Sequence, residues 1–287
     1  MPDHALMPEI EKDELSSLSP DGFFRALERA DVFLPVATEA SPVPAESRVV
    51  VYSSPQSAGA DRFRLARIRL NNLQAARKLK TLLITSPLPE DGKSTVALNL
   101  ATALSEKGKP PVLLLEADVY RSAIVKKLGL NPWPGLTECF MQGADPMLAI
   151  RRIEPLGFYL LPAGQPMEDG SNLLQSSFAS QLIKGLASSS FSWILIDSPP
   201  TTPIADILAL KAQSDATLLV ARAGVTPRED IEESIQNLGR DHIIGIILSG
   251  VEGLDRVYSR YYGYGKSEDS GRASKSKEIL GLHERGD

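Results

Sequence analysis

The chain has 287 residues, enough for one large α/β domain with flanking segments, and its 43% hydrophobic and 23% charged residues are ordinary for a globular protein. The net charge of −5 argues against nucleic-acid binding as the main activity, and the single cysteine, Cys139, excludes an internal disulfide and suits a reducing compartment. Because no apolar run approaches 18 residues and no signal-peptide pattern opens the chain, we expect a cytoplasmic protein.

The first 57 residues are rich in Pro, Ala, Ser and Glu, which predicts a flexible leader. Its clearest linker is VATEASPVPAES, at residues 36–47. Within the leader, SPDGFFRALERADVF at residues 19–33 has the spacing of a short amphipathic helix. That helix is either a fraying terminal element or a docking helix for a partner.

From residue 58 to residue 80 apolar side chains recur at helical spacing, and arginines occupy the remaining faces of the expected helix. Asp61, Arg64 and Arg67 follow one another at intervals of three residues, so they share one helix face. This face is either a solvated basic surface or an interface between subunits.

Strands and helices then alternate, which predicts a doubly wound, mostly parallel sheet with helices on both faces, over residues 58–251. Continuous apolar runs are typical of strands that are buried on both faces. The expected strands are TLLITS (81–86), PVLLLEAD (111–118), WILIDSPP (193–200), ATLLVARAG (216–224) and IIGIILSGV (243–251). The expected helices lie at 93–108, 171–189, 205–213 and 227–239, and residues 252–287 form a flexible tail.

The first of these strands runs into SPLPEDGKST, residues 86–95, which places Gly-Lys-Ser between a strand and a helix. This is the context of a phosphate-binding loop, in which backbone N–H groups and the helix dipole attract an anion. Lys93 would reach the phosphates, the Ser94 hydroxyl would bind Mg²⁺, and Thr95 would add a phosphate contact. The residues expected to bind the cofactor are Glu90, Asp91, Gly92, Lys93, Ser94 and Thr95.

Three carboxylates follow two further strands of the expected sheet. Glu116 and Asp118 end the run PVLLLEAD, and Asp197 lies in the run WILIDSPP. In doubly wound folds ligands bind at the carboxyl ends of the strands, so these side chains should converge on the phosphate-binding loop. Carboxylates beside a polyphosphate need a cation between them, so we expect Mg²⁺ to be held by Ser94, Asp118 and Asp197.

These motifs, in this order, resemble those of the bacterial tyrosine kinases of capsule and exopolysaccharide biosynthesis, P-loop NTPases with a MinD/ParA-like fold. SPLPEDGKST, EADVY and IDSPP stand where that family has its Walker A, Walker A′ and Walker B motifs. The resemblance covers about residues 60–264. It implies an ATP- and Mg²⁺-dependent tyrosine autokinase whose catalytic residues are Lys93, Glu116, Asp118 and Asp197.

The resemblance also gives a role to YSRYYGYGK, residues 258–266, where tyrosines crowd into a polar tail. It implies that these tyrosines receive the γ-phosphoryl group of ATP from the active site of a neighbouring subunit. The expected phosphoacceptors are Tyr258, Tyr261, Tyr262 and Tyr264.

Partners follow from the same resemblance. The family forms rings of subunits through a helix with the spacing of Asp61, Arg64 and Arg67, which favours an interface there. Further implied partners are a separate inner-membrane polysaccharide co-polymerase, which would activate the kinase and recruit it to the plasma membrane, and a cognate tyrosine phosphatase. Nucleic acid is not expected as a partner.

The chain departs from the family pattern at four positions. Glu116 replaces an aspartate, Tyr120 an arginine, Glu90 a loop glycine, and Ser249 stands where the family often has an asparagine. One alternative is therefore a catalytically weak regulatory ATPase that acts with a membrane partner. A MinD/ParA-like positioning ATPase is disfavoured by Leu88, which stands where those proteins have a second lysine. A third alternative treats the tail as an interaction segment.

Overall fold

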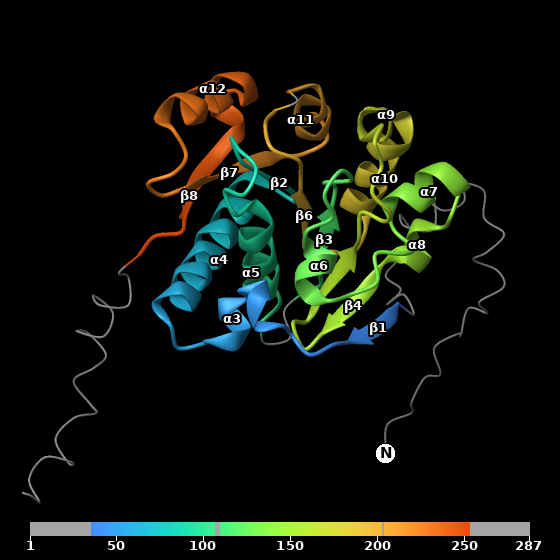
Figure 1. The fold of residues 1–287 in the computed structure, drawn as a ribbon, viewed down its shortest axis with the longest axis horizontal. Coiled ribbons are helices and arrows are strands. Elements are labelled where there is room, and N and C mark those ends of the chain that lie inside the picture. Colours follow the sequence, from blue (N-terminus) through green and yellow to red (C-terminus); the bar gives the residue numbers. More distant parts are fainter. Residues whose placement is uncertain (1–35, 107–109, 203, 253–287) are drawn as a thin grey trace, which may run out of the picture. The chain divides into compact units, whose positions relative to one another are not determined.

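The computed structural model describes residues 36–106, 110–202 and 204–252 (Figure 1). The chain divides into one unit of Met1–Val251 and a second of Glu252–Asp287, and the fold described below is that of the first. The helix that we expected at residues 19–33 lies outside the described residues, as do the four tyrosines of the tail.

The described residues form an eight-stranded sheet in the order β1-β4-β5-β3-β6-β2-β7-β8. Neighbouring strands are parallel except for β4 and β5, which are antiparallel, so the predicted doubly wound, mostly parallel sheet is confirmed. The strands are β1 (Ala37–Ala40), β2 (Thr81–Thr85), β3 (Val112–Glu116), β4 (Arg151–Glu154), β5 (Phe158–Leu161), β6 (Trp193–Asp197), β7 (Ala216–Arg222) and β8 (Ile243–Ser249).

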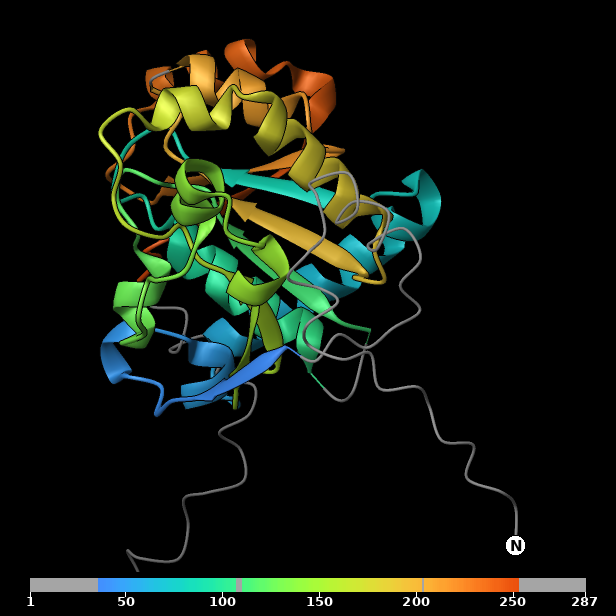
Figure 2. The same cartoon turned by 90° about the vertical axis from the view of Figure 1, so that its right-hand side faces the viewer.

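Helices cover both faces of the sheet, with α4 and α5 on one face and α10, α11 and α12 on the other (Figures 1 and 2). Within the described residues, no helix has both the length and the apolar character that a membrane span requires. The helices are α3 (Val50–Ser53), α4 (Ala58–Arg77), α5 (Lys93–Ser105), α6 (Ile124–Leu128), α7 (Leu136–Gln142), α8 (Pro146–Ala149), α9 (Gly170–Leu174), α10 (Ser177–Ser188), α11 (Ile204–Lys211) and α12 (Arg228–Leu238), with short 3₁₀ turns at Ala45–Ser47 and Arg240–His242.

The central strands are apolar along their whole length because both of their faces are covered. In β2, Leu82 and Ile84 pack with Leu98 of α5, whereas Leu83 packs on the opposite face with Leu186 of α10. Side chains of a strand alternate between the faces of the sheet, so an uninterrupted apolar run is what a strand between two helix layers requires. This arrangement fixes the register of the strands whose carboxyl ends carry the polar residues.

The structure differs from the flexible leader that we predicted up to residue 57. Residues 37–40 form β1, which pairs with β4, and Val49 and Val51 are buried in the segment that leads into α4. The Val51 N–H also donates to the side chain of Asn99 in α5, over 3.2 Å. The prediction failed here because it weighed the Pro, Ala and Ser content of the segment and overlooked its few buried apolar residues.

Candidate nucleotide-binding site

The phosphate-binding loop joins the carboxyl end of β2 to the start of α5. Gly92 is the N-cap residue of α5 and no side chain caps this helix, whereas Ser57 caps α4 and Ser176 caps α10. The first N–H groups of a helix have no partner within the helix, and they carry the positive end of its dipole. The amides of Lys93, Ser94 and Thr95 are therefore suited to receive an anion.

Two residues of this loop have positive φ angles. Gly92 has a φ of +98°, which favours glycine, and a Cβ atom there would make a tight contact of 3.2 Å with the Ser249 side chain. Glu90 has a φ of +67° although it has a side chain, and that side chain is exposed. The backbone thus demands at residue 90 the left-handed conformation that a glycine adopts most easily.

Asp91 is turned into the protein. Its carboxylate accepts hydrogen bonds from the Leu88 N–H at 2.9 Å and from the Thr226 hydroxyl at 2.6 Å, and the Ser249 hydroxyl donates to its carbonyl oxygen. Asp91 is 2% exposed. Its carboxylate ties the loop to the segment after β7 and its carbonyl ties the loop to the end of β8, so the cofactor contact that we predicted for Asp91 is left to its N–H group.

Lys93 and Asp118 meet across the site. The Lys93 Nζ atom lies 2.8 Å from Asp118 Oδ2, and the other oxygen of Asp118 accepts from the Arg121 N–H at 3.1 Å. Burial disfavours the charged ammonium, but Asp197, Asp118 and Glu116 outweigh burial and raise the pKa of Lys93 above its ordinary value. Lys93 is therefore a permanent cation among carboxylates at neutral pH.

Asp197 occupies the centre of this edge of the sheet, since it pairs with Ile84 of β2 on one side and with Glu116 of β3 on the other. It is fully buried, and neither carboxylate oxygen has a hydrogen-bond partner of good geometry among the described residues. Burial raises the pKa of Asp197 to about 6, although Lys93 and the nearby Ser94 hydroxyl favour the charged form. A buried carboxylate without partners is costly unless a cation or donor meets it.

These residues fit Mg²⁺ by donor type and by the unpartnered oxygens of Asp197. Among the described residues no three His, Cys, Asp or Glu side chains form a cluster that could hold a metal by themselves. Mg²⁺ is usually held by one or two carboxylates together with water and substrate phosphates. Asp197, Asp118 and the Ser94 hydroxyl are the protein ligands that this arrangement offers.

Glu116 lies beside Asp197 but its carboxylate is occupied. One oxygen accepts from the Ile124 N–H at 2.7 Å and the other from the Ala163 N–H at 3.2 Å. Burial raises the pKa of Glu116 to about 7 against the effect of these two amides. Glu116 thus joins the start of α6 to the end of β5, and its catalytic role remains a prediction.

Sequence reasoning missed Thr226, Asp206 and Lys127, and it named Tyr120 and Ser249 without their contacts. Thr226 and Ser249 hold the phosphate-binding loop from the far side, and Tyr120 bonds to Asp206 rather than to a ligand. Lys127 of α6 lies near enough to Asp197 to favour its ionised form. No sequence motif predicts these contacts, because each one joins elements far apart in the chain.

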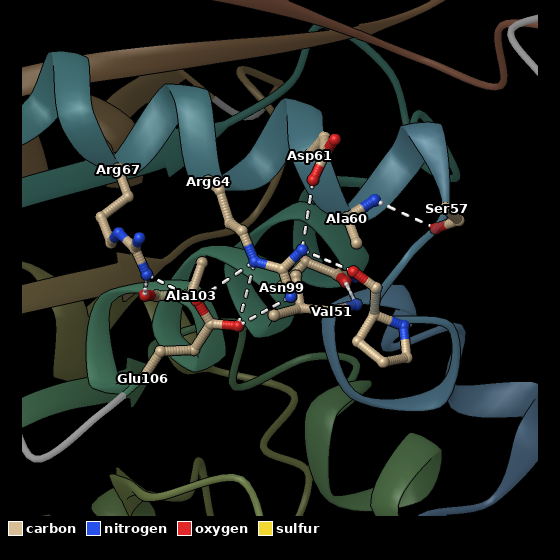
Figure 3. Close-up of polar contacts among 10 residues, drawn as sticks. Val51, Ser57, Ala60, Asp61, Arg64, Arg67, Asn99, Ala103 and Glu106 are labelled. Carbon is tan, nitrogen blue, oxygen red and sulfur yellow. Dashed lines mark hydrogen bonds and ion pairs between the residues drawn. The ribbon is translucent and has the colours of Figure 1, made fainter. Parts of the chain in front are cut away.

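The helix face of Asp61, Arg64 and Arg67 lies at the other end of α5, about 20 Å along a helix of this length (Figure 3). Both arginines bind Glu106: Arg64 Nη2 lies 3.0 Å from Oε1 and Arg67 Nη1 lies 2.5 Å from Oε2. Arg64 also binds Asp61 at 3.2 Å, and Arg67 donates to the Ala103 carbonyl at 2.9 Å. We call these four charged residues the Glu106 cluster.

The Glu106 cluster is an intramolecular tie between α4 and α5. Burial disfavours the charged form of Glu106, but Arg64 and Arg67 outweigh burial and lower its pKa. The interface role that we predicted for Asp61, Arg64 and Arg67 must therefore coexist with contacts that the same side chains make within the chain.

Comparisons with known proteins give the context of this site. No family profile matches the chain. The chain is 26% identical over 220 residues to the tyrosine-protein kinase YwqD of Bacillus subtilis, covering 76% of this chain and 92% of that protein. It is 28% identical to the tyrosine-protein kinase wzc of Salmonella typhimurium and 27% identical to the succinoglycan biosynthesis transport protein ExoP of Rhizobium meliloti, over 76% and 75% of this chain. It spans only 30% of the length of each of these last two proteins.

Solved structures agree with the sequence relatives. The kinase domain of Escherichia coli tyrosine kinase ETK matches with a TM-score of 0.69 at 24% identity, over 75% of this chain and 83% of that one, which establishes the fold. The BceF tyrosine kinase domain matches with a TM-score of 0.63 at 25% identity, over 80% of this chain and 97% of that one. The predicted resemblance to the bacterial tyrosine kinases is confirmed, and the names of the curated relatives support protein-tyrosine kinase activity.

Proposed function

From its likeness to the bacterial tyrosine kinases, we propose that this chain is an ATP-dependent protein-tyrosine kinase that regulates the biosynthesis or export of an exopolysaccharide or capsule. The observation that carries the proposal is the convergence of Lys93, Asp118 and the unpartnered Asp197 at the uncapped start of α5. This arrangement suits a polyphosphate with its divalent cation.

In the proposed reaction the amides at the start of α5 hold the phosphates and Lys93 neutralises charge that develops during transfer. To do so, the Lys93 ammonium would bind phosphate oxygens either in addition to Asp118 or in its place. Ser94, Asp118 and Asp197 would hold Mg²⁺, which offsets phosphate charge and orients the transferring group when bound.

The acceptor is a tyrosine, whose phenol has an ordinary pKa of about 10 and needs help to lose its proton. Asp118 is the better placed of the two Walker A′ carboxylates to accept it, because one of its oxygens binds only the Lys93 ammonium, which phosphate oxygens can draw away, whereas both oxygens of Glu116 bind backbone amides. The acceptors that we propose are Tyr258, Tyr261, Tyr262 and Tyr264, supplied by a neighbouring subunit. They lie outside the described residues.

We further propose a ring-like assembly that uses the exposed side of the Glu106 cluster. Asp61 keeps 41% of its side chain exposed and Arg64 keeps 26%, so a neighbour can reach these groups without breaking the bonds to Glu106. Phosphorylation of four tyrosines would add roughly −6 to −8 charges at neutral pH and so favour disassembly of such a ring. Equal assembly of phosphorylated and unphosphorylated protein would contradict this.

The same likeness suggests the partners and the location. We propose that the chain works at the cytoplasmic face of the plasma membrane, where a separate polysaccharide co-polymerase recruits and activates it. A cognate tyrosine phosphatase would reverse the modification. Since the chain spans 30% of the wzc and ExoP proteins, the remainder of each is a guide to what such a membrane partner supplies.

The test is phosphotyrosine formation on purified protein with Mg·ATP, mapped by mass spectrometry, with and without the cytoplasmic segment of the membrane partner. Lys93→Met should abolish the label, and changing the four tail tyrosines to Phe should remove its sites. Lys80→Met is the matched control. Lys80 lies just before the start of β2, at the end of that strand away from the phosphate-binding loop, and its ammonium donates to the Ser189 carbonyl. This variant should keep full activity.

A regulatory ATPase of low kinase activity is the second candidate, and Glu90 is the observation that favours it. An exposed carboxylate in the phosphate-binding loop is unfavourable for a triphosphate. ATP binding or hydrolysis without any phosphotyrosine, even with the partner segment present, would support this candidate and refute the kinase.

A further inference from the structure

The hydroxyl of Tyr120, in the loop that follows β3, binds a buried carboxylate. It donates to Asp206 Oδ2 over 2.7 Å, and Asp206, in α11, is fully buried. The bond therefore joins the Walker A′ loop to a separate helix.

Asp206 is held by two further neutral donors, both from the region of α9. The Ser171 hydroxyl donates to Oδ1 over 2.5 Å and the Gln175 side-chain amide donates to the same oxygen over 3.2 Å. No ion pair of Asp206 occurs among the described residues. A buried carboxylate without a cation depends on its hydrogen bonds, so each donor is held firmly in place.

The packing around this carboxylate is close. A Cβ atom on Gly170 would lie 2.5 Å from Val119 Cγ2 and 2.9 Å from Tyr120 Cζ, so only glycine fits at the start of α9. The Met167 N–H also donates to the Val119 carbonyl over 3.0 Å. Residues 119–120 are thus clamped between the start of α9 and the Asp206 carboxylate.

We propose that Asp206 is a positioning residue for the transfer reaction, which acts through Tyr120 to hold Asp118 in place. Asp118 lies two residues before Tyr120, and its carboxylate binds Lys93 and the Arg121 amide, on the other side of Tyr120. α11 belongs to the segment that follows Asp197 in the chain. The Tyr120–Asp206 bond therefore links the loop that carries Asp118 to the helix that follows the strand ending at Asp197.

The inference rests on the proposed kinase function, but part of its test does not. Tyr120→Phe removes only the hydroxyl that reaches Asp206. Gln175→Ala is the matched control, because it removes another bond to the same carboxylate from outside the Walker A′ loop. Thermal unfolding of both variants reports any loss of stability. Amide hydrogen exchange of residues 117–123 reports the order of the loop without any need for activity.

Tyr120→Phe should speed exchange in residues 117–123 at least ten-fold and lower kcat for phosphotyrosine formation about ten-fold, with KM for Mg·ATP within two-fold of wild type. Gln175→Ala should leave the exchange rates and kcat within two-fold of wild type. Adding Tyr120→Phe to Asp206→Asn should cause no further loss, because residues that act through one contact are not additive. If the wild type has no kinase activity but Tyr120→Phe still exchanges faster than the wild type, the proposed kinase function is refuted and the positioning of Asp118 is supported.

Two results would overturn the inference. One is an unchanged Tyr120→Phe variant, in both exchange and kcat. The other is an equal loss of exchange protection and kcat in Tyr120→Phe and Gln175→Ala that follows their unfolding temperatures, which would mean that Asp206 only stabilises the fold. If Asp206→Asn does not fold, the comparison of the two single variants still decides between these outcomes.

Discussion

The conformation of Glu90 gives a prediction whose magnitude can be worked from the structure. Its φ of +67° lies in the left-handed region, which costs a residue with a side chain roughly 1–2 kcal/mol. Glycine adopts this conformation freely but loses more entropy on folding, roughly 0.5–1 kcal/mol relative to alanine. Glu90→Gly should therefore raise the free energy of unfolding by about 1 kcal/mol, or Tm by about 2–4 °C.

The charge of Glu90 contributes less than its backbone. At about 10 Å in water, one carboxylate and three net phosphate charges repel by about 1.2 kcal/mol without salt, and physiological salt reduces this to about a third. Glu90→Gln should thus improve ATP affinity less than two-fold at physiological salt and more at low salt. It should leave stability nearly unchanged, because glutamine carries the same backbone strain.

The assay is urea unfolding of the wild type, Glu90→Gly and Glu90→Gln, with ATP titrations at two salt concentrations. The comparison separates the two effects, since both variants lack the charge and only one relieves the strain. A Glu90→Gly protein no more stable than Glu90→Gln would refute the argument from φ. An affinity gain that does not depend on salt would refute the argument from charge.

Three further predictions follow from the buried charges and the thiol. Glu106→Gln should lower the free energy of unfolding by about 2 kcal/mol in urea, because it removes a carboxylate that two arginines share, whereas Glu232→Gln, in the exposed pair with Arg228, should cause no measurable change. Folding raises the pKa of Asp197 from 3.8 to about 6, so the wild type loses stability as pH rises through this window. In thermal unfolding with EDTA, Asp197→Asn and the wild type should therefore be equally stable near pH 4. The variant should become steadily more stable than the wild type between about pH 4 and pH 6 and keep that difference at higher pH. Burial raises the pKa of Cys139 to about 12, so this thiol should react with a thiol reagent at pH 8 only after denaturant is added; rapid reaction of the native protein would contradict its burial.

The sheet and the location of the site could be predicted from sequence because both depend on order along the chain. The apolar runs predicted strands buried on both faces, which holds for β2, β3 and β6 but not for the edge strand β8, where Ile246 and Leu248 are exposed. Parallel strands bring their carboxyl ends to one edge. That reasoning placed Lys93, Asp118 and Asp197 together, and the structure joins the first two at 2.8 Å. The family resemblance separately marked residue 90 as the usual position of a loop glycine, and Glu90 has a positive φ in the structure.

What could not be predicted is where each carboxylate points. Asp91 and Glu116 were both expected to face the ligand, yet the first binds Leu88 and Thr226 and the second binds two backbone amides. Their partners lie between 3 and 135 residues away in the chain, and no motif specifies them. Composition likewise missed the strand at 37–40, because four residues at the edge of a sheet carry little periodic signal.

The departures from the kinase pattern acquire a physical meaning when their contacts are considered together. Both oxygens of Glu116 and the hydroxyl of Tyr120 bind protein groups, so these two substitutions alter the support of the site rather than the charges that face a ligand. Lys93, Asp118 and Asp197, which do face it, have the residue types of the pattern. The extra methylene of Glu116 lets one carboxylate span two amides, and Tyr120 binds Asp206 without placing a further positive charge among the carboxylates. Such changes preserve the requirements for binding a phosphate and its cation, which a kinase and a regulatory ATPase share, so phosphotyrosine formation is the property that separates the two.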